Sequence, residues 1–225
     1  MVAKLTPMKR SAKLGQKNLL SKKKVAGPGM ESLQGQFLVA MPMMTDKRFK
    51  ESVLYVVEHN ADGAMAIAVH QTMTDINFGD VLSDIELSAS AAQGDRKIEV
   101  SEAMASQPVL RGGPVQTGQG FVLHASDTQI ASEAFEINSE ISLSASLDIL
   151  KTMALEGRPE KSLFALGYCG WSPGQLEGEL AQNSWLTVPH NSDLLFETAF
   201  EKRYDKALEL IGVSRANLSA FSGRA

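Results

Sequence analysis

Short apolar runs rich in β-branched and aromatic residues predict strands along most of the chain. Two of these runs, 52–58 and 64–69, flank Asp62-Gly63, where glycine supplies the positive φ of a tight reversal, so they predict a hairpin. Their apolar residues are consecutive rather than alternating, and we therefore expect both faces of the hairpin to be covered. The other predicted strands are 37–41, 97–100, 108–111, 120–124, 141–144, 163–168 and 185–188.

The strongest helix signal lies between the last two of these strands. Ser172 suits an N-cap, Pro173 suits the first helical position, and Gln175 suits the N3 position of a capping box. Because three separate start signals agree, the sequence predicts a helix over 173–183. Its apolar stripe consists of Leu176 and Leu180.

Two other segments show the 3.6-residue spacing of an amphipathic helix. One begins at Leu147 and can end at Gly157, the other covers 200–210, and a weaker pattern covers 78–85. Strands first, a helix in the middle and then alternating strands and helices indicate the α+β class, or a mixed α/β sheet. No segment within 30–225 has the composition of a linker, so we expect a single domain there.

Charge is distributed unevenly along the chain. The 225 residues carry a formal net charge of −4, but residues 1–30 hold eight Lys and Arg and no acid. The remainder has 14 basic against 26 acidic residues, a net charge of −12. A strongly positive segment with few apolar residues cannot bury enough surface to offset its ordering entropy, so we predict that 1–29 is a disordered tail.

Three roles stay open for this tail. It can be an arm for nucleic acid or another anionic surface, a targeting segment, or an extension without function upstream of an alternative start at Met30. The acidic body has no helix-turn-helix signature and repels phosphate, so any contact with nucleic acid is assigned to residues 1–29.

Composition removes several classes of protein. An apolar fraction of 44% is ordinary for a folded protein and argues against disorder of the whole chain. No apolar run approaches the roughly 18 residues of a membrane span, so no membrane partner is expected. A single cysteine, Cys169, cannot form an internal disulfide, which excludes a disulfide-stapled secreted scaffold.

Polar residues at the ends of predicted strands are candidates for chemistry. Glu58 and His59 end one strand and suggest a base or a metal site. Because successive side chains of a strand point to opposite faces, the competing interpretation is a polar strand end without chemistry. His124 ends another strand and, with His59 and Glu58 or Glu179, can build a site of two histidines and one carboxylate. No HxxxH, HExxH or paired-cysteine pattern accompanies them, and we therefore predict neither a metal nor a cofactor.

The loop Gly112-Gly113-Pro114 follows a predicted strand. Glycines allow close backbone approach and can present amides to an anion, but Pro114 has no amide and no nucleotide-binding glycine pattern is present. A structural turn or a backbone crossing is the competing interpretation. Cys169 has no adjacent base, so we expect a small buried residue rather than a nucleophile.

The predicted helix over 173–183 has a polar face. Gln175, Glu179 and Gln182 follow i, i+4, i+7 spacing, and Glu179 and Asn183 are also one turn apart. This face is either solvated or the polar wall of a pocket.

Six motifs, taken in order, resemble the YqgE/AlgH family of bacterial proteins. They are FLVAMP at 37–42, the pair Asp46 and Phe49, SVLYVVEHN at 52–60 with Gly63-Ala64, GGPV at 112–115, GFVLH at 120–124 and LGYCGWSPGQLEGEL…NSW at 166–185. The resemblance covers about residues 31–212. It implies a cytoplasmic protein whose single domain has a bifurcated β-sheet curled into a pseudo-barrel and flanked by helices. Family members are often labelled transcriptional regulators, and the resemblance assigns no biochemical activity.

The chain departs from the family pattern at two places. Val57 stands where the family commonly has cysteine before Glu-His, and His70-Gln71 stand where it commonly has asparagine and a basic residue. These departures argue against a site built on a Cys-Glu-His trio.

The favoured function is a non-enzymatic binding or regulatory module that takes a protein or small-molecule partner on a rigid scaffold. Its pocket is expected to be lined by Glu58, His59, Gly112, Gly113, Pro114, His124, Trp171, Gln175, Glu179, Asn183 and Trp185. One alternative is an enzyme, such as a hydrolase, that uses His124 or His59 with Glu179, although no set of nucleophile, base and orienting group is visible. The other alternative is DNA binding through the tail.

The charge distribution makes the DNA alternative testable. Any DNA binding by the full chain is expected to weaken steeply with salt and to vanish when residues 1–29 are removed, because only they can release phosphate counterions. Filter binding or fluorescence anisotropy at several salt concentrations measures this. Binding retained by residues 30–225 would contradict the electrostatic argument.

Overall fold

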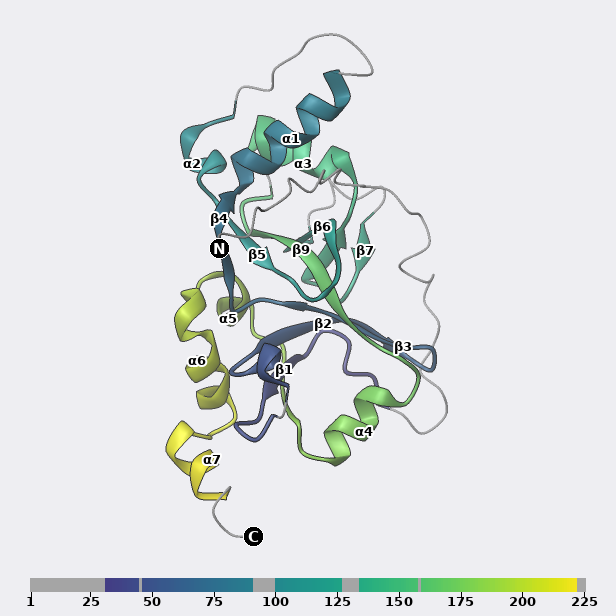
Figure 1. Cartoon of the computed structure of the whole chain (residues 1–225), viewed down its shortest axis with the longest axis vertical. Coiled ribbons are helices and arrows are strands. Elements are labelled where there is room, and N and C mark those ends of the chain that lie inside the picture. Colours follow the sequence, from purple (N-terminus) through teal and green to yellow (C-terminus); the bar gives the residue numbers. More distant parts are fainter. Residues whose placement is uncertain (1–30, 45, 91–99, 127–133, 158, 222–225) are drawn as a thin grey trace, which may run out of the picture.

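A mixed β-sheet with helices around it forms the body of the protein (Figure 1). The computed structural model describes residues 31–44, 46–90, 100–126, 134–157 and 159–221. The main path of the sheet has the order β10-β1-β2-β3-β9-β6-β8-β7, and β5 pairs with both β9 and β4. The strands are β1 (Phe37–Ala40), β2 (Val53–Asn60), β3 (Gly63–Ala68), β4 (Thr72–Asn77), β5 (Pro108–Arg111), β6 (Val115–Ala125), β7 (Phe135–Glu136), β8 (Ile141–Ser144), β9 (Ser162–Trp171) and β10 (Trp185–Val188).

Strand β9 belongs to both halves of the sheet and makes it bifurcate. Its first half, around Phe164–Leu166, lies between β6 on one side and β5 on the other, and the β5 pairing is parallel. Its second half, Cys169–Trp171, leaves β5 and pairs with β3. The hairpin β2–β3 and the outer strands β1 and β10 are therefore joined to the β5–β6–β8 half through one strand.

Helices cover the sheet at three places (Figure 1). Helices α1 to α3 lie together at one end, α5 to α7 run along one side, and α4 lies beside β3 and β10. None of the helices in the described part of the chain is long and apolar enough to cross a membrane. They are η1 (Lys47–Phe49), α1 (Phe78–Ser90), α2 (Glu102–Ala105), α3 (Leu147–Glu156), α4 (Gln175–Ala181), α5 (Ser192–Phe196), η2 (Phe200–Lys202), α6 (Arg203–Leu210) and α7 (Arg215–Phe221).

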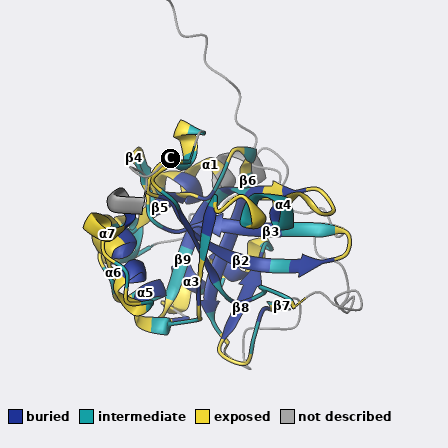
Figure 2. Cartoon of the chain, turned by 90° about the horizontal axis from the view of Figure 1, so that it is seen from below, coloured by how far each residue is buried: buried dark blue, intermediate teal, exposed yellow. Residues whose placement is uncertain are grey.

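The core is divided into three clusters because both faces of the sheet are covered. Figure 2 shows the central strands mostly buried and the outward faces of α6 and α7 exposed. The first cluster packs α5 and α6 on the sheet, the second lies under α4, and the third lies under α1 and α3. Consecutive apolar residues in β2 thus enter different clusters, with Tyr55 in the first and Leu54 and Val56 in the second.

The predicted α+β class and the single domain with a bifurcated, curled sheet are confirmed, as is the hairpin over 52–69. The turn is stabilised by Asn60, whose side-chain oxygen accepts from the Asp62 N–H at 2.8 Å. The helix from Leu147 ends at Gly157, which adopts the left-handed conformation (φ 64°).

Other predictions need correction. The helix expected over 173–183 begins later, at Gln175, because Gly174 has φ 75° and cannot lie inside a right-handed helix. Ser172 makes no side-chain cap, but the other half of the capping box forms, with the Ser172 N–H donating to the Gln175 side chain at 3.1 Å. Strand β4 and the short helices α2, α5 and α7 were not predicted. The tail 1–29 and residues 97–99 of the strand expected over 97–100 lie outside the described residues, and Val100 is not in a strand.

The Gly112-Gly113 loop is a backbone crossing over β9. A Cβ on Gly112 would lie 2.3 Å from the Gly167 carbonyl oxygen, and one on Gly113 would lie 2.1 Å from the carbonyl carbon of Tyr168. Gly112 also donates to the Leu166 carbonyl at 2.9 Å and accepts from the Ala68 N–H at 2.8 Å. The loop therefore joins β3 and β9 by main-chain contacts that leave no room for a side chain.

Gly112→Ala is expected to destabilise the protein by about 3 kcal/mol, because the added methyl group meets backbone rather than a movable side chain. For a chain of this length that lowers the thermal midpoint by roughly 6–12 °C. Gly118→Ala is the control, since a methyl group added there would have no described atom within 4 Å, and a change within about 0.5 kcal/mol is expected. Equal thermal midpoints for the two variants would contradict the crossing.

Candidate functional site

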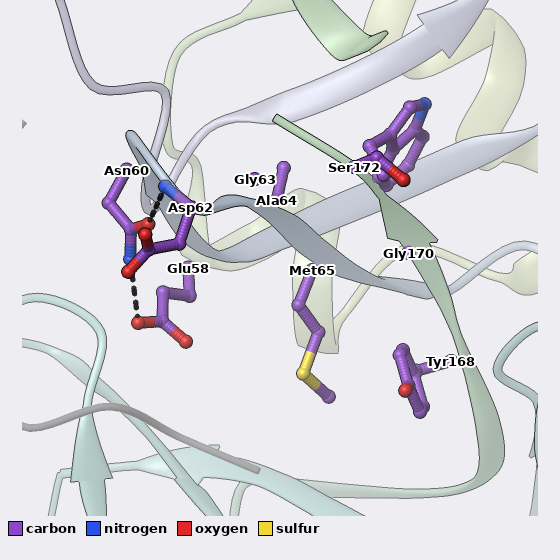
Figure 3. A pocket seen from close by; sticks show the side chains of 10 residues that line it. Glu58, Asn60, Asp62, Gly63, Ala64, Met65, Tyr168, Gly170 and Ser172 are labelled. Carbon is purple, nitrogen blue, oxygen red and sulfur yellow. Dashed lines mark hydrogen bonds between the residues drawn. The ribbon is translucent and has the colours of Figure 1, made fainter. Parts of the chain in front are cut away.

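A cavity with a volume of about 450 Å³ opens beside the β2–β3 hairpin. We call it the hairpin pocket, and its lining residues are Glu58, Asn60, Asp62, Gly63, Ala64, Met65, Tyr168, Gly170, Trp171 and Ser172. Figure 3 shows Glu58, Met65 and Tyr168 projecting to the same side of the strands, with Asn60 and Asp62 at the hairpin turn. The lining contains two carboxylates and the aromatic ring of Tyr168 but no Lys, Arg or His among the described residues.

Strand register explains how these side chains meet. Glu58 is the cross-strand partner of Met65, and Met65 is the partner of Gly170, so the three form one row across β2, β3 and β9. A β-bulge after Val56 sets this register in β2. Because Gly170 has no side chain, the ring of Tyr168 lies directly beside it, with Cε2 3.2 Å from the point that a Cβ would occupy. A hydrogen bond from the Asn60 amide at 2.9 Å orients the Glu58 carboxylate.

His59 points away from this pocket, as strand alternation predicts. It is 4% exposed, its Nδ1 accepts from the Leu33 N–H at 3.0 Å, and its Nε2 lies 2.9 Å from Glu177 Oε1. A backbone N–H can only donate, so Nδ1 carries no proton and the ring is neutral, with Nε2–H donating to the carboxylate. Burial alone would raise the pKa of Glu177, but hydrogen bonds from its own backbone and from His59 outweigh burial and lower that pKa.

Glu179 joins three elements through one carboxylate. Its Oε2 accepts from the indole N–H of Trp171 at 2.9 Å and from that of Trp185 at 2.7 Å, and its Oε1 accepts from Gln175 at 3.1 Å. The two indoles pack edge to face with their centroids 6.1 Å apart. The polar face of α4 is thus a clamp that fixes the ends of β9 and β10. Asn183 lies outside both cavities, exposed in the turn after α4 with φ 55°.

His124 is sealed inside the other half of the sheet. It is 0% exposed, its Nδ1 donates to the Ala125 carbonyl at 2.9 Å, and its Nε2 lies 2.9 Å from the Ser144 hydroxyl. Cross-strand pairing places His59, through β3, in the same row as Trp171 of β9, and it places His124 in the same row as Ser162 of β9. These two β9 positions are nine residues apart, roughly 30 Å of strand. The two histidines therefore cannot share one ligand, and the predicted site of two histidines and one carboxylate does not form.

The predicted site residues are therefore divided among separate places. Glu58 and Trp171 line the hairpin pocket, while Gly113 and Pro114 line a second cavity of about 270 Å³. His59, His124, Gly112, Gln175, Glu179 and Trp185 serve the packing of the fold instead. Sequence reasoning missed Asn60, Asp62, Met65 and Tyr168, although their positions in the hairpin and opposite it on β9 were a usable signal. Among the described residues no group of three or more His, Cys, Asp and Glu is placed to hold a metal ion.

Glu179→Gln is expected to lower the free energy of unfolding by about 1–3 kcal/mol. The amide has a single oxygen, so it cannot accept from both indoles and from Gln175 at once. Chemical denaturation measures the loss, and a changed tryptophan emission reports the loosened clamp. Glu160→Gln, at an exposed position, is the control and should change stability by less than about 0.5 kcal/mol. Equal stability of the two variants would contradict the clamp.

Cys169 is expected to resist thiol reagents in the folded protein. Burial raises the pKa of its thiol to about 12, against roughly 8.5 for an exposed cysteine. The folded state therefore holds this proton more tightly, and its contribution to stability is complete below about pH 8.5 and is lost as the pH rises toward 12. Ellman's reagent at about pH 8 should react only after unfolding, and Cys169→Ala should reduce the alkaline loss of stability. Rapid labelling of the native protein would show the thiol to be accessible.

Comparison with known proteins agrees with this architecture. The AlgH-like family model matches residues 37–216. A UPF0301 protein from Azorhizobium caulinodans is 44% identical over 199 residues, covering 88% of this chain and 95% of its own length. Another from Rhodopseudomonas palustris is 42% identical over 193 residues, covering 86% and 87%.

Two solved structures are similar. The solution structure of the AlgH protein from Pseudomonas aeruginosa superposes with a TM-score of 0.67 at 37% identity, covering 90% of this chain and 98% of that one. A crystal structure of a protein from Corynebacterium diphtheriae shares the fold at 16% identity, with a TM-score of 0.54 and coverage of 85% and 90%. The family match over most of the chain and the identities above 40% lead to one conclusion: the chain belongs to the AlgH-like family.

Proposed function

We propose that the protein is a non-enzymatic binding module whose hairpin pocket takes a positively charged group of a protein or small-molecule partner. The observation that carries the proposal is the lining of that pocket, which combines the carboxylates of Glu58 and Asp62 with the ring of Tyr168 and contains no basic residue among those described. Carboxylates attract a cation, and the face of the Tyr168 ring adds a cation–π contribution.

Two further features support a cationic partner. Residues 31–225 carry a net charge of −12, which raises the local concentration of cations around the whole body. The pocket is built on three hydrogen-bonded strands, and the Glu179 clamp fixes the end of β9 from their other face, so little conformational entropy is lost when a ligand binds.

The hydrolase alternative has one geometric argument in its favour, the contact between His124 and Ser144. Both side chains are buried, at 0% and 5% exposure, and neither lines either of the two cavities. A nucleophile must reach the substrate carbonyl, and a sealed pair cannot. We therefore assign this pair to the packing of β6 on β8.

A regulatory role agrees with this proposal if the protein acts by binding another protein rather than DNA. The acidic body repels the phosphate groups of DNA, so a regulator of this kind would act by binding a basic segment of another protein. We propose that this activity is in the cytoplasm, as the family resemblance implies.

A matched pair of peptides tests the pocket. Acetyl-Gly-Arg-Gly-amide is expected to bind the full chain with millimolar affinity and to shift the amide resonances of Met65 and Gly170, while the peptide with citrulline in place of arginine does not. Citrulline keeps the shape and removes the charge. High salt should weaken the arginine peptide, because the carboxylates are near solvent.

Substitutions distinguish binding in the hairpin pocket from attraction to the overall negative charge of the protein body. Glu58→Gln is expected to weaken the arginine peptide by roughly threefold, and Glu160→Gln, at an exposed position outside the pocket lining, should leave it unchanged. Affinity capture from a bacterial lysate with the native chain and with Glu58→Gln then identifies partners that need the pocket. Equal binding of the arginine and citrulline peptides would overturn the proposal.

A further inference from the structure

The second cavity has the opposite chemistry from the hairpin pocket. It lies where η1, the end of β3, the β5–β6 loop and β9 meet, and its volume is about 270 Å³. Its described lining contains Arg48, His70 and Arg111 but no Asp or Glu. In a body with a net charge of −12, a cavity lined by cationic and neutral residues alone is an exception to the general charge.

Arg111 supplies the available positive charge. Its backbone N–H donates to the Gln71 carbonyl at 3.0 Å, but its guanidinium makes no hydrogen bond or ion pair within the described part of the chain. Arg48 is different, because Asp46 accepts from its Nε at 3.0 Å and from its second guanidinium nitrogen at 2.6 Å. Burial lowers the pKa of His70, so that ring adds no charge at neutral pH.

Ser52 provides an independent sign of a missing partner. It lines the cavity and is 0% exposed. Its backbone is satisfied, since its N–H donates to the Phe49 carbonyl at 3.1 Å and its carbonyl accepts from the Ala40 N–H at 2.9 Å. Its hydroxyl, however, has no hydrogen-bond partner among the described residues. Buried hydroxyls are nearly always paired, so this one points to a group that binds there.

The remaining walls favour an organic ligand over a bare ion. Phe49, Met73, Leu166 and Pro114 give the cavity an apolar side. The adjoining loop is held by the glycine crossing over β9, so the cavity is largely formed before a ligand arrives. Pro114 has no N–H, and recognition of an anion must therefore come from side chains rather than from a nest of amides.

We propose that this cavity binds a small organic anion, a carboxylate or phosphate group on an apolar body, with Arg111 pairing the charge and the Ser52 hydroxyl completing its hydrogen bonds. A guanidinium matches the two oxygens of either group in a bidentate contact. The ligand's apolar part lies against Phe49 and Met73. This site is separate from the hairpin pocket and does not depend on the function proposed for it.

The test uses the full chain, with phenyl phosphate and benzoate as the anionic probes and benzyl alcohol as the neutral one. Binding is followed by amide shifts in NMR spectra. Both anions are expected to shift Ser52, Gln71 and Thr117, and benzyl alcohol to bind at least about tenfold more weakly. If only phenyl phosphate binds, the ligand class is narrowed to phosphate esters and the site stands. Shifts no larger for the anions than for the alcohol, or shifts confined to other regions, would overturn the proposal.

Variants test the two residues separately. Arg111→Gln is expected to weaken phenyl phosphate at least about tenfold, while Lys50→Gln, which removes an exposed charge outside the cavity lining, leaves the affinity unchanged. Ser52→Ala is expected to weaken it about threefold without lowering the thermal midpoint of the free protein, because no protein partner is lost. Unchanged affinity in Arg111→Gln, or an equal loss in Lys50→Gln, would refute a specific pairing with Arg111.

Discussion

The close backbone contact between the Gly112-Gly113 loop and β9 is the constraint on which the other features depend. Cβ atoms added to these glycines would overlap backbone atoms of Gly167 and Tyr168, so main chain packs on main chain. The contact lets β9 leave β5 and continue to β3, which joins the two halves of the sheet. Gly112 adds two main-chain hydrogen bonds at this junction, one to Leu166 of β9 and one to Ala68 of β3.

Two cavities lined by residues of opposite charge lie on either side of this crossing. Tyr168 and Cys169 follow each other on β9, and their side chains point to different faces, so one lines the hairpin pocket and the other lines the second cavity. The first cavity has Glu58 and Asp62 and the second has Arg48 and Arg111.

The sequence predicted the individual helices and strands better than it predicted which of their residues lie close together. The hairpin, the α+β class and the helix ended by Gly157 follow from local rules about periodicity, turns and caps. Strand β4 was missed because its sequence, TMTDIN, has few apolar residues and its pairing with β5 supplies the order. The predicted grouping of site residues was wrong because strand register and β-bulges decide which strand ends lie close together. His59 and His124 look alike in sequence, yet roughly 30 Å of β9 separates their levels.

Hydrogen exchange of two amides tests the central role of the crossing most directly. The Gly112 N–H bonds to the Leu166 carbonyl, and the Ala68 N–H bonds to the Gly112 carbonyl. If the crossing holds the halves of the sheet together, both amides exchange only when the whole protein unfolds, at the same free energy as the core amide of Val56. Exchange of Gly112 and Ala68 through a local opening, while Val56 stays protected, would show that the fold does not depend on the crossing.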